Sequence, residues 1–150
     1  MKLSIPLQRK DPRLPVYVVI PNRHVQSWNL YGTTVIEGTA NGFPIGRRTI
    51  KAWGKGTDDW FVEFTASFCK TANLHVGDIV SLDVEVADMS VPQELQDILL
   101  KSKCLEITWQ ALSESDRRVA CEHIRAAKTQ ATRERRAAVL AEKLQGDATT

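Results

Sequence analysis

The sequence predicts an α+β fold, in which a small β-barrel or sandwich is followed by a segment of about three to four helices. Two sequence patterns support this prediction, and the first gives way to the second near Ser90. Before Ser90, apolar residues alternate, β-branched residues are frequent, and proline or glycine punctuates the chain, as is typical of short strands. After Ser90, no glycine occurs before Gly146, and the apolar positions change to helical spacing.

These patterns divide the 150 residues into parts with different expected structures. We expect an N-terminal extension at residues 1–11, a β-barrel at 12–88, a helical segment at 89–146 and a short tail at 147–150. The helical segment has only a few large apolar side chains. We therefore expect it to pack on the barrel rather than to form a core of its own.

The first strand of the barrel is expected at Val16–Ile20, a run of five apolar or aromatic residues. Another strand, over Thr33–Ala40, leads into Asn41-Gly42. That dipeptide supplies the positive φ angles of a tight hairpin turn. The strand over Thr33–Ala40 should therefore pair with one that begins near Phe43.

The hairpin is expected to continue through Arg47–Trp53, turn at residues 54–59 and return over 60–66. The last strand is predicted at residues 78–88, where apolar and polar residues alternate. Its apolar positions are Val80, Leu82, Val84 and Val86, and its polar positions are Ser81, Asp83 and Glu85. This period of two places one side of the strand in the core.

Helix starts in the second part are indicated by capping residues. Ser90 and Gln93 match a capping box, with Pro92 in the first turn, where its missing N–H is harmless. Ser113 marks a further start. The helix after Ser113 carries an apolar stripe formed by Ala120, Ile124 and Ala127, with Cys121 beside it.

The last helix is expected over residues 130–145 and is predicted to stop at Gly146. Its buried positions should be Ala137, Leu140 and Leu144.

Composition and charge exclude several classes of protein. No segment approaches the ~20 apolar residues needed to span a bilayer, so we expect no membrane insertion. Pro6 interrupts the only short apolar run near the N-terminus, so the chain lacks a secretory signal and is expected to be cytoplasmic. The net charge of +2 is too small to indicate a nucleic-acid partner by itself. Three dispersed cysteines, Cys69, Cys104 and Cys121, favour neither disulfides nor a zinc site, and we expect no metal or cofactor.

The helical end resembles the YdeI-like, OmpD-associated family of bacteria, sometimes labelled bacteriocin-protection proteins. The resemblance rests on "LSESDRR", "IRAAKTQATRERR" and "LAEKL", with Ile124, Ala127-Lys128, Thr132-Arg133 and Arg135-Arg136 as its pattern. The preceding part, with "VIEGTANGFPIGRRTI", "WFVEF" and "LHVGDIVSLDVEV", is similar to the small β-domain of unknown function that often precedes that segment.

The resemblance implies a compact pseudo-barrel, distantly like the double-split barrels of AbrB-type proteins. It also implies an association with tolerance of antimicrobial peptides or envelope stress. It supplies no catalytic residues. We therefore expect a non-enzymatic module that binds a small anionic ligand or a protein partner.

Residues 41–57 concentrate glycines and basic side chains, yet they do not form a phosphate-binding loop. Gly42 and Gly46 are separated by three residues instead of four, and the context is strand-turn-strand. With Trp53 and Trp60 near the second turn, outward-facing Arg47 and Lys51 could contact phosphates or stacked bases. The alternative, which we favour, is that they lie on a solvated face and protect the ribbon from edge-to-edge pairing. Arg48 shares the face of Ile50, where an acid such as Glu37 or Glu63 could pair with it.

A second basic group lies near the start of the last helix. Lys128, Arg133 and Arg136 could converge on an anionic ligand, and this is our candidate ligand site. The alternative, which we favour, is that the arginines bond carboxylates or carbonyls of the β-domain and lock the two parts together. Arg135 points away from the docking face and, with Arg47 and Lys51, would form the nucleic-acid-binding site of a second hypothesis, an AbrB-like regulatory protein.

Catalytic residues are not predicted. His24, His75 and His123 are far apart, and none of them lies in a nucleophile, zincin or deaminase motif. Asp58 and Asp59 are adjacent on an extended chain, so their side chains diverge and do not form a shared acid or metal site.

Overall fold

The N-terminal part of the molecule is a single antiparallel sheet. The structure, a computed structural model, describes the backbone of residues 1–149 and the side chains of residues 1–147. Within this range, seven strands occur before Asp88: β1 (Lys2–Pro6), β2 (Val16–Ile20), β3 (Thr34–Ala40), β4 (Phe43–Pro44), β5 (Arg48–Ala52), β6 (Trp60–Phe64) and β7 (Ile79–Val86). The chain divides between Asp88 and Met89 into two units, called here the barrel unit and the helical unit.

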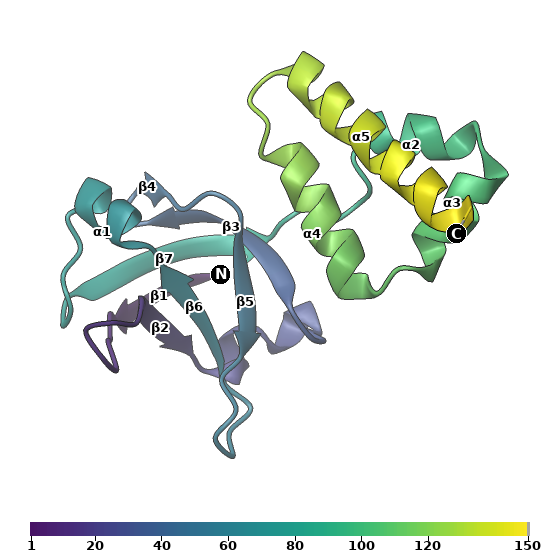
Figure 1. The fold of residues 1–150 in the computed structure, drawn as a ribbon. Coiled ribbons are helices and arrows are strands. Elements are labelled where there is room, and N and C mark those ends of the chain that lie inside the picture. Colours follow the sequence, from purple (N-terminus) through teal and green to yellow (C-terminus); the bar gives the residue numbers. More distant parts are fainter. Residues whose placement is uncertain (150) are drawn as a thin grey trace. The chain divides into compact units, whose positions relative to one another are not determined.

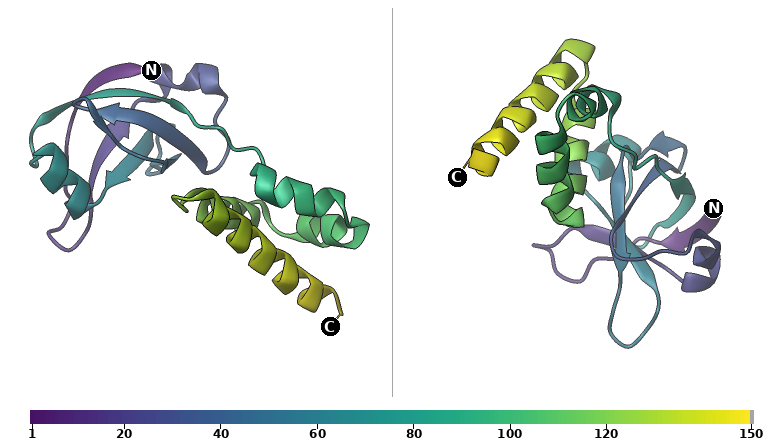
Figure 2. Two further views of the ribbon diagram at one scale, coloured as in Figure 1. Left: turned by 90° about the horizontal axis from the view of Figure 1, so that it is seen from above. Right: turned by 90° about the vertical axis from the view of Figure 1, so that its right-hand side faces the viewer.

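The sheet of the barrel unit is nearly closed. Its strand order is β1-β7-β3-β5-β6-β2, with β4 paired to β3 outside this path (Figure 1). Residues after β1 return to the opposite edge, where Gln8 and Tyr17 exchange two backbone hydrogen bonds of 2.8 and 2.9 Å. The strands therefore curve around one interior (Figure 2), which confirms the predicted barrel.

Tight turns form where the sequence predicts them. Asn41 and Gly42 both have positive φ, 50° and 80°, and join β3 to β4. Asparagine and glycine tolerate this left-handed conformation, which matches the twist of a two-residue hairpin.

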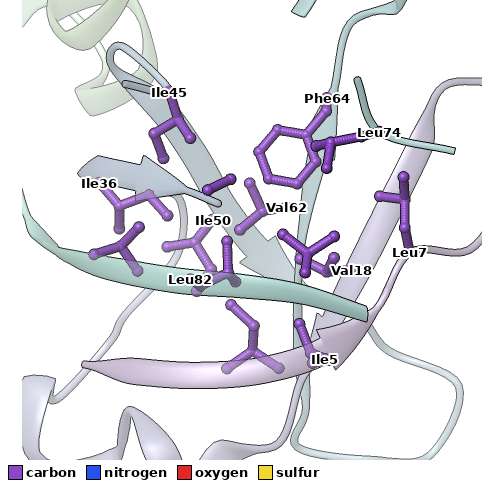
Figure 3. Close-up of a cluster of buried hydrophobic side chains, with 14 of the residues drawn as sticks. Ile5, Leu7, Val18, Ile36, Ile45, Ile50, Val62, Phe64, Leu74 and Leu82 are labelled. Carbon is purple, nitrogen blue, oxygen red and sulfur yellow. The ribbon is translucent and has the colours of Figure 1, made fainter. Parts of the chain in front are cut away.

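Alternation along the strands builds the core of the barrel unit. In β7, Val80, Leu82 and Val84 are buried, whereas Val86, the last residue of the strand, is 39% exposed at the end of the pairing with β3. Figure 3 shows side chains from several strands meeting in the interior, with Ile50 and Val62 among them.

At Gly38, β3 lies too close to β7 to leave room for a side chain. Gly38 faces Val84 across β3 and β7 and has φ of 141°. A Cβ atom at this position would lie 2.1 Å from the carbonyl oxygen of Asp83 and 2.7 Å from the Cα of Val84. Only glycine fits there, because both the space and the backbone conformation exclude a side chain.

The predicted N-terminal extension at residues 1–11 is wrong in part, because β1 belongs to the sheet. It pairs with β7 along its whole length, and Ile5 and Leu7 are buried. Pro6 ends β1 at an edge of the path of strands, where a missing N–H is tolerated. That proline hid the alternation of Ile5 and Leu7 from the sequence analysis.

Short helical pieces complete the barrel unit. Two 3₁₀ turns, at Asn22–His24 and Gln26–Trp28, follow β2. The helix α1 (Ala66–Ala72) follows β6, and the Thr65 hydroxyl caps its start by accepting from the N–H of Phe68. Its other end is closed by Asn73 in the left-handed conformation.

The helical unit contains four helices within the described residues. They are α2 (Gln93–Leu100), α3 (Lys103–Ala111), α4 (Glu114–Arg125) and α5 (Gln130–Thr149), and α5 packs against the other three (Figure 1). Their number confirms the prediction of three to four helices. None of the helices within the described residues has the length and apolarity needed to cross a bilayer.

The helical unit has its own core, contrary to expectation. Nine residues form it: Leu95, Leu99, Leu105, Trp109, Cys121, Ile124, Ala137, Ala141 and Leu144. The prediction missed it because the sequence analysis placed no helix at α3, whose Leu105 and Trp109 lie one turn apart and are both buried.

Two predicted helix ends also differ from the structure. The capping box at Ser90 is wrong: α2 begins at Gln93, after Pro92, without a side-chain cap. A box would place Val91 in the first turn, where the following proline disfavours helical angles. The predicted stop at Gly146 is wrong too, since α5 continues to Thr149 and residue 150 lies outside the described range. A glycine within a helix costs only about 1 kcal/mol relative to alanine.

Candidate functional site

Arg133, a predicted ligand residue, is engaged inside the helical unit. Its Nε donates to a carboxylate oxygen of Glu94 at 3.4 Å, and the Glu94 side chain is only 12% exposed. Its two terminal nitrogens donate to the backbone oxygen of Ala127 at 2.9 Å and to the side-chain oxygen of Gln130 at 3.0 Å. Arg133 thus ties the start of α5 to α2 and to the end of the preceding helix.

The other two predicted ligand residues differ from each other. Arg136 is half-buried and donates to the backbone oxygen of His123 at 2.6 Å. Lys128 is exposed. The partners of Arg133 and Arg136 lie in the helical unit, so the expectation that they bond groups of the β-domain is wrong. These arginines connect the helices to one another.

The residues of the nucleic-acid hypothesis lie on different elements. Arg47, just before β5, is half-buried, and its guanidinium donates to the backbone oxygen of Asp88 at 2.6 Å and lies 4.0 Å from Glu37. Lys51 is exposed on β5, and Arg135 is exposed on α5. Arg47 therefore does not face solvent as a free cation, in contrast to the sequence interpretation.

Arg48 is held by rings and a carbonyl within the described residues, and the expected pairing with Glu37 or Glu63 is wrong. Its guanidinium carbon lies 5.4 Å from the ring centre of Phe64 and 5.0 Å from that of Phe68. Its Nε donates to the backbone oxygen of Ile45 at 2.9 Å. Burial lowers the pKa of Arg48, and cation–π contact partly replaces the lost water.

A hollow of about 910 Å³ lies beside α1 in the barrel unit. Its walls come from Arg9 and residues 12–16, before and at the start of β2, from the end of β6, and from α1 and the turn after it. The buried side chains of Val16, Phe64 and Leu74 give it an apolar floor. Leu14 and Val76, 49% and 54% exposed, form apolar parts of the rim.

The rim of the hollow is basic. Arg9, Arg13, Lys70 and His75 line it, and no aspartate or glutamate is among the described lining residues. Arg13 already binds Asp11 through two side-chain hydrogen bonds, which lower the pKa of Asp11. The Nε of Arg9 donates to the backbone oxygen of Leu14 at 3.1 Å. Because a carbonyl carries no net charge, this bond leaves the positive charge of Arg9 uncompensated.

A smaller hollow of about 380 Å³ adjoins the first one. The two share Pro15, Phe64 and Thr65, and the smaller is lined by both Arg47 and Arg48. Glu63 is the acidic residue among its described lining residues. Sequence reasoning missed both hollows because their basic residues are scattered between positions 9 and 75 and carry no motif.

The helical unit corresponds to a known family. Residues 88–146 match a family model described as bacteriocin-protection, YdeI or OmpD-associated. The helical segment is therefore similar to YdeI/OmpD-associated domains. A search of curated proteins gave no match. A search of solved structures gave none either.

The residues that carried the resemblance have structural roles in the helical unit. Ile124 and Ala127 are buried at the end of α4 and just after it. Arg133 and Arg136 form the hydrogen bonds that join α5 to the helices before it. Because side chains with these contacts preserve the packing of the helices, the pattern can be explained without a ligand.

The three cysteines should differ in their rates of alkylation, because their environments differ. Cys69 lines the hollow in the barrel unit, whereas Cys104 is exposed and Cys121 is buried in the helical unit. Burial raises the pKa of the Cys69 thiol, and the charges of Arg48 and Arg9 only partly oppose this. Since the thiolate is the nucleophile, iodoacetamide at pH 7 should modify Cys104 first and Cys69 slowly. Cys121 should react only after unfolding.

The pH dependence of alkylation tests whether burial raises the pKa of the Cys69 thiol. The folded-state pKa of Cys69 is raised, so its alkylation should accelerate at a higher pH than that of free cysteine, measured by peptide mass spectrometry. Rapid modification of Cys69 at pH 7 would show that its thiol is not shielded from water.

Proposed function

We propose that this protein is a non-enzymatic cytoplasmic module that binds a small anionic ligand with an apolar body in the hollow beside α1. The observation that supports this most is the pairing of an apolar floor with a basic rim in a hollow of about 910 Å³. Ligand pockets commonly measure about 300–1,000 Å³, with mostly apolar walls and a few orienting polar groups.

Charge favours an anion over a cation. Lys70 and Arg9 approach the hollow, and neither forms an ion pair within the described residues. Both can donate to a carboxylate or phosphate without first breaking a salt bridge. The rim therefore disfavours strongly cationic peptides, so a role in tolerance of antimicrobial peptides, which the family description suggests, would be exercised through a small ligand.

The chemistry of the lining supports binding over catalysis. A general acid–base pair requires titratable side chains placed toward one another. The titratable neighbours are the thiol of Cys69, whose pKa is raised by burial, and His75, whose Nδ1 lies 3.6 Å from Asp78. Among the described residues no three or more His, Cys, Asp or Glu side chains gather to hold a metal.

A matched series of probes tests the proposed ligand chemistry. Decanoate should bind and raise the midpoint of thermal unfolding, because a ligand that binds only the folded state stabilises it. Decanol and decyltrimethylammonium carry the same chain without the negative charge, and both should bind at least about tenfold more weakly, equal to about 1.4 kcal/mol.

Two variants locate the site. Lys70→Ala should weaken decanoate binding roughly three- to tenfold, measured by titration calorimetry. The matched control is Lys101→Ala, an exposed lysine of the helical unit, which should leave the affinity unchanged. Equal affinity for decanoate and decyltrimethylammonium, or equal losses in the two variants, would contradict the proposal.

A further inference from the structure

Three aromatic rings from separate segments gather on the outer face of the barrel unit. The ring centres of Tyr17 and Trp53 are 5.1 Å apart, with planes inclined by 34°. Those of Trp53 and Phe61 are 5.5 Å apart and meet edge to face at 69°. All three side chains remain partly exposed. We call Tyr17, Trp53 and Phe61 the ring cluster.

Strand register explains why this cluster faces outward. In β2, Val16, Val18 and Ile20 point into the core, so Tyr17 points away from it. In β6, Val62 is buried, so the neighbouring Phe61 points outward. Lys51 pairs with Phe61 across β5 and β6 and is exposed on the same side.

Lysines surround the ring cluster without acidic partners. The Nζ of Lys55 lies 5.5 Å from the ring centre of Trp53. The side chain of Lys10, through a hydrogen-bond contact and through charge repulsion, lowers the pKa of Lys55. Within the described residues, Lys10, Lys51 and Lys55 take part in no ion pair. Like charges repel one another, so an anion that approaches these lysines would be favoured.

Acidic side chains limit this face on two sides. Glu63 pairs in register with Tyr17, and Asp59 accepts a hydrogen bond from the backbone of Asn22 at 3.4 Å. The combination of rings with three lysines thus occupies one bounded area and does not continue as a general basic surface.

We infer that the ring cluster, together with Lys10, Lys51 and Lys55, binds single-stranded nucleic acid. Bases of any sequence can stack on aromatic rings, and lysines beside the rings can neutralise the phosphates. Duplex bases already stack on one another, so their faces are unavailable to the rings. Of the residues that the sequence suggested for nucleic-acid contact, this site keeps Lys51 and Trp53 and leaves out Arg47, Trp60 and Arg135. It is also separate from the hollow beside α1.

Fluorescence anisotropy of the full chain with two labelled probes tests the inference. The probes are an oligothymidylate of roughly twelve nucleotides and an abasic strand of the same length. At ~50 mM salt the thymidylate should bind at least about tenfold more tightly than the abasic strand. The slope of log affinity against log salt should be about −2, because three neutralised phosphates contribute roughly −0.7 each.

Substitutions assign the binding to named residues. Trp53→Ala should weaken thymidylate binding about tenfold. Lys55→Glu, on an exposed side chain, should weaken it at least fivefold even if Trp53→Ala disturbs the fold. Tyr31→Ala and Lys101→Glu are the matched controls, since Tyr31 is 87% exposed and Lys101 lies in the helical unit. Both should bind as the unchanged protein does.

Several results would overturn the inference. Equal affinity for the two probes would mean attraction by charge alone. Absence of binding at ~50 mM salt, tighter binding to a duplex of the same length, or equal losses in Lys55→Glu and Lys101→Glu would each exclude this surface. Decanoate binding should be unchanged in Lys55→Glu, which keeps this test independent of the ligand proposed for the hollow.

Discussion

Replacing Gly38 with alanine should prevent the barrel unit from folding or destabilise it by about 4 kcal/mol or more. The added Cβ would lie 2.1 Å from the carbonyl oxygen of Asp83, a contact that only separation of β3 from β7 could relieve. Those strands pair along five positions in the centre of the sheet, so the damage cannot stay local. Urea unfolding followed by tryptophan fluorescence should show the loss, because Trp28, Trp53 and Trp60 all lie in the barrel unit.

Gly42→Ala is the matched control for Gly38→Ala. It also requires a positive φ, 80°, but a Cβ at Gly42 would meet no atom within 4 Å. The expected cost is about 1–2 kcal/mol, from backbone conformation alone. The helical signal at 222 nm should persist in Gly38→Ala, because the helical unit has a separate core. Similar stability of the two variants would show that β3 and β7 do not approach so closely.

Arg133→Ala should destabilise the helical unit by about 2–3 kcal/mol. The substitution removes three hydrogen bonds and leaves the carboxylate of Glu94 without its cation. The cost arises mainly from Glu94, because its side chain is 12% exposed and water cannot fully replace the guanidinium. Urea unfolding monitored at 222 nm measures the change.

Two further variants separate this ion pair from general effects of charge. Arg135→Ala alters an exposed arginine of the same helix and should change stability by no more than about 0.5 kcal/mol. Glu94→Gln combined with Arg133→Ala should cost less than the sum of the single changes, because neither partner is then a buried lone charge. Strict additivity would mean that Arg133 stabilises the helices without Glu94.

The sequence was sufficient for the elements of the barrel whose signals are local. A run of apolar residues identified β2, and alternation identified β7. Asn41-Gly42 identified the hairpin after β3, because turn geometry depends on adjacent residues. The sequence failed at β1, which ends at Pro6 and forms through pairing with distant β7. In the helical unit, the stripe around Ile124 was recognised, whereas the core contribution of Trp109 was overlooked.

The candidate site was much less accessible to sequence reasoning. Alternation placed Arg48 correctly beside the face of Ile50, but its partners, Phe64 and Phe68, come from β6 and α1. The hollow depends on the same convergence, since Arg9 and Lys70 meet only through chain topology. Local sequence patterns indicate which way a side chain points. They do not indicate which residues, distant in the sequence, it contacts.

The pairing of the first strand with the last also governs how the barrel can form during synthesis. The N-terminal ammonium of Met1 donates to the backbone oxygen of Val84, 83 residues away, and β1 lies between β7 and the closing bridge. A growing chain therefore carries β1 without its neighbour until β7 has left the ribosome. Such distant contacts slow folding, whereas the helices that follow depend on nearby residues. The helical unit, although made after the barrel unit, can thus complete its fold before β1 and β7 have paired.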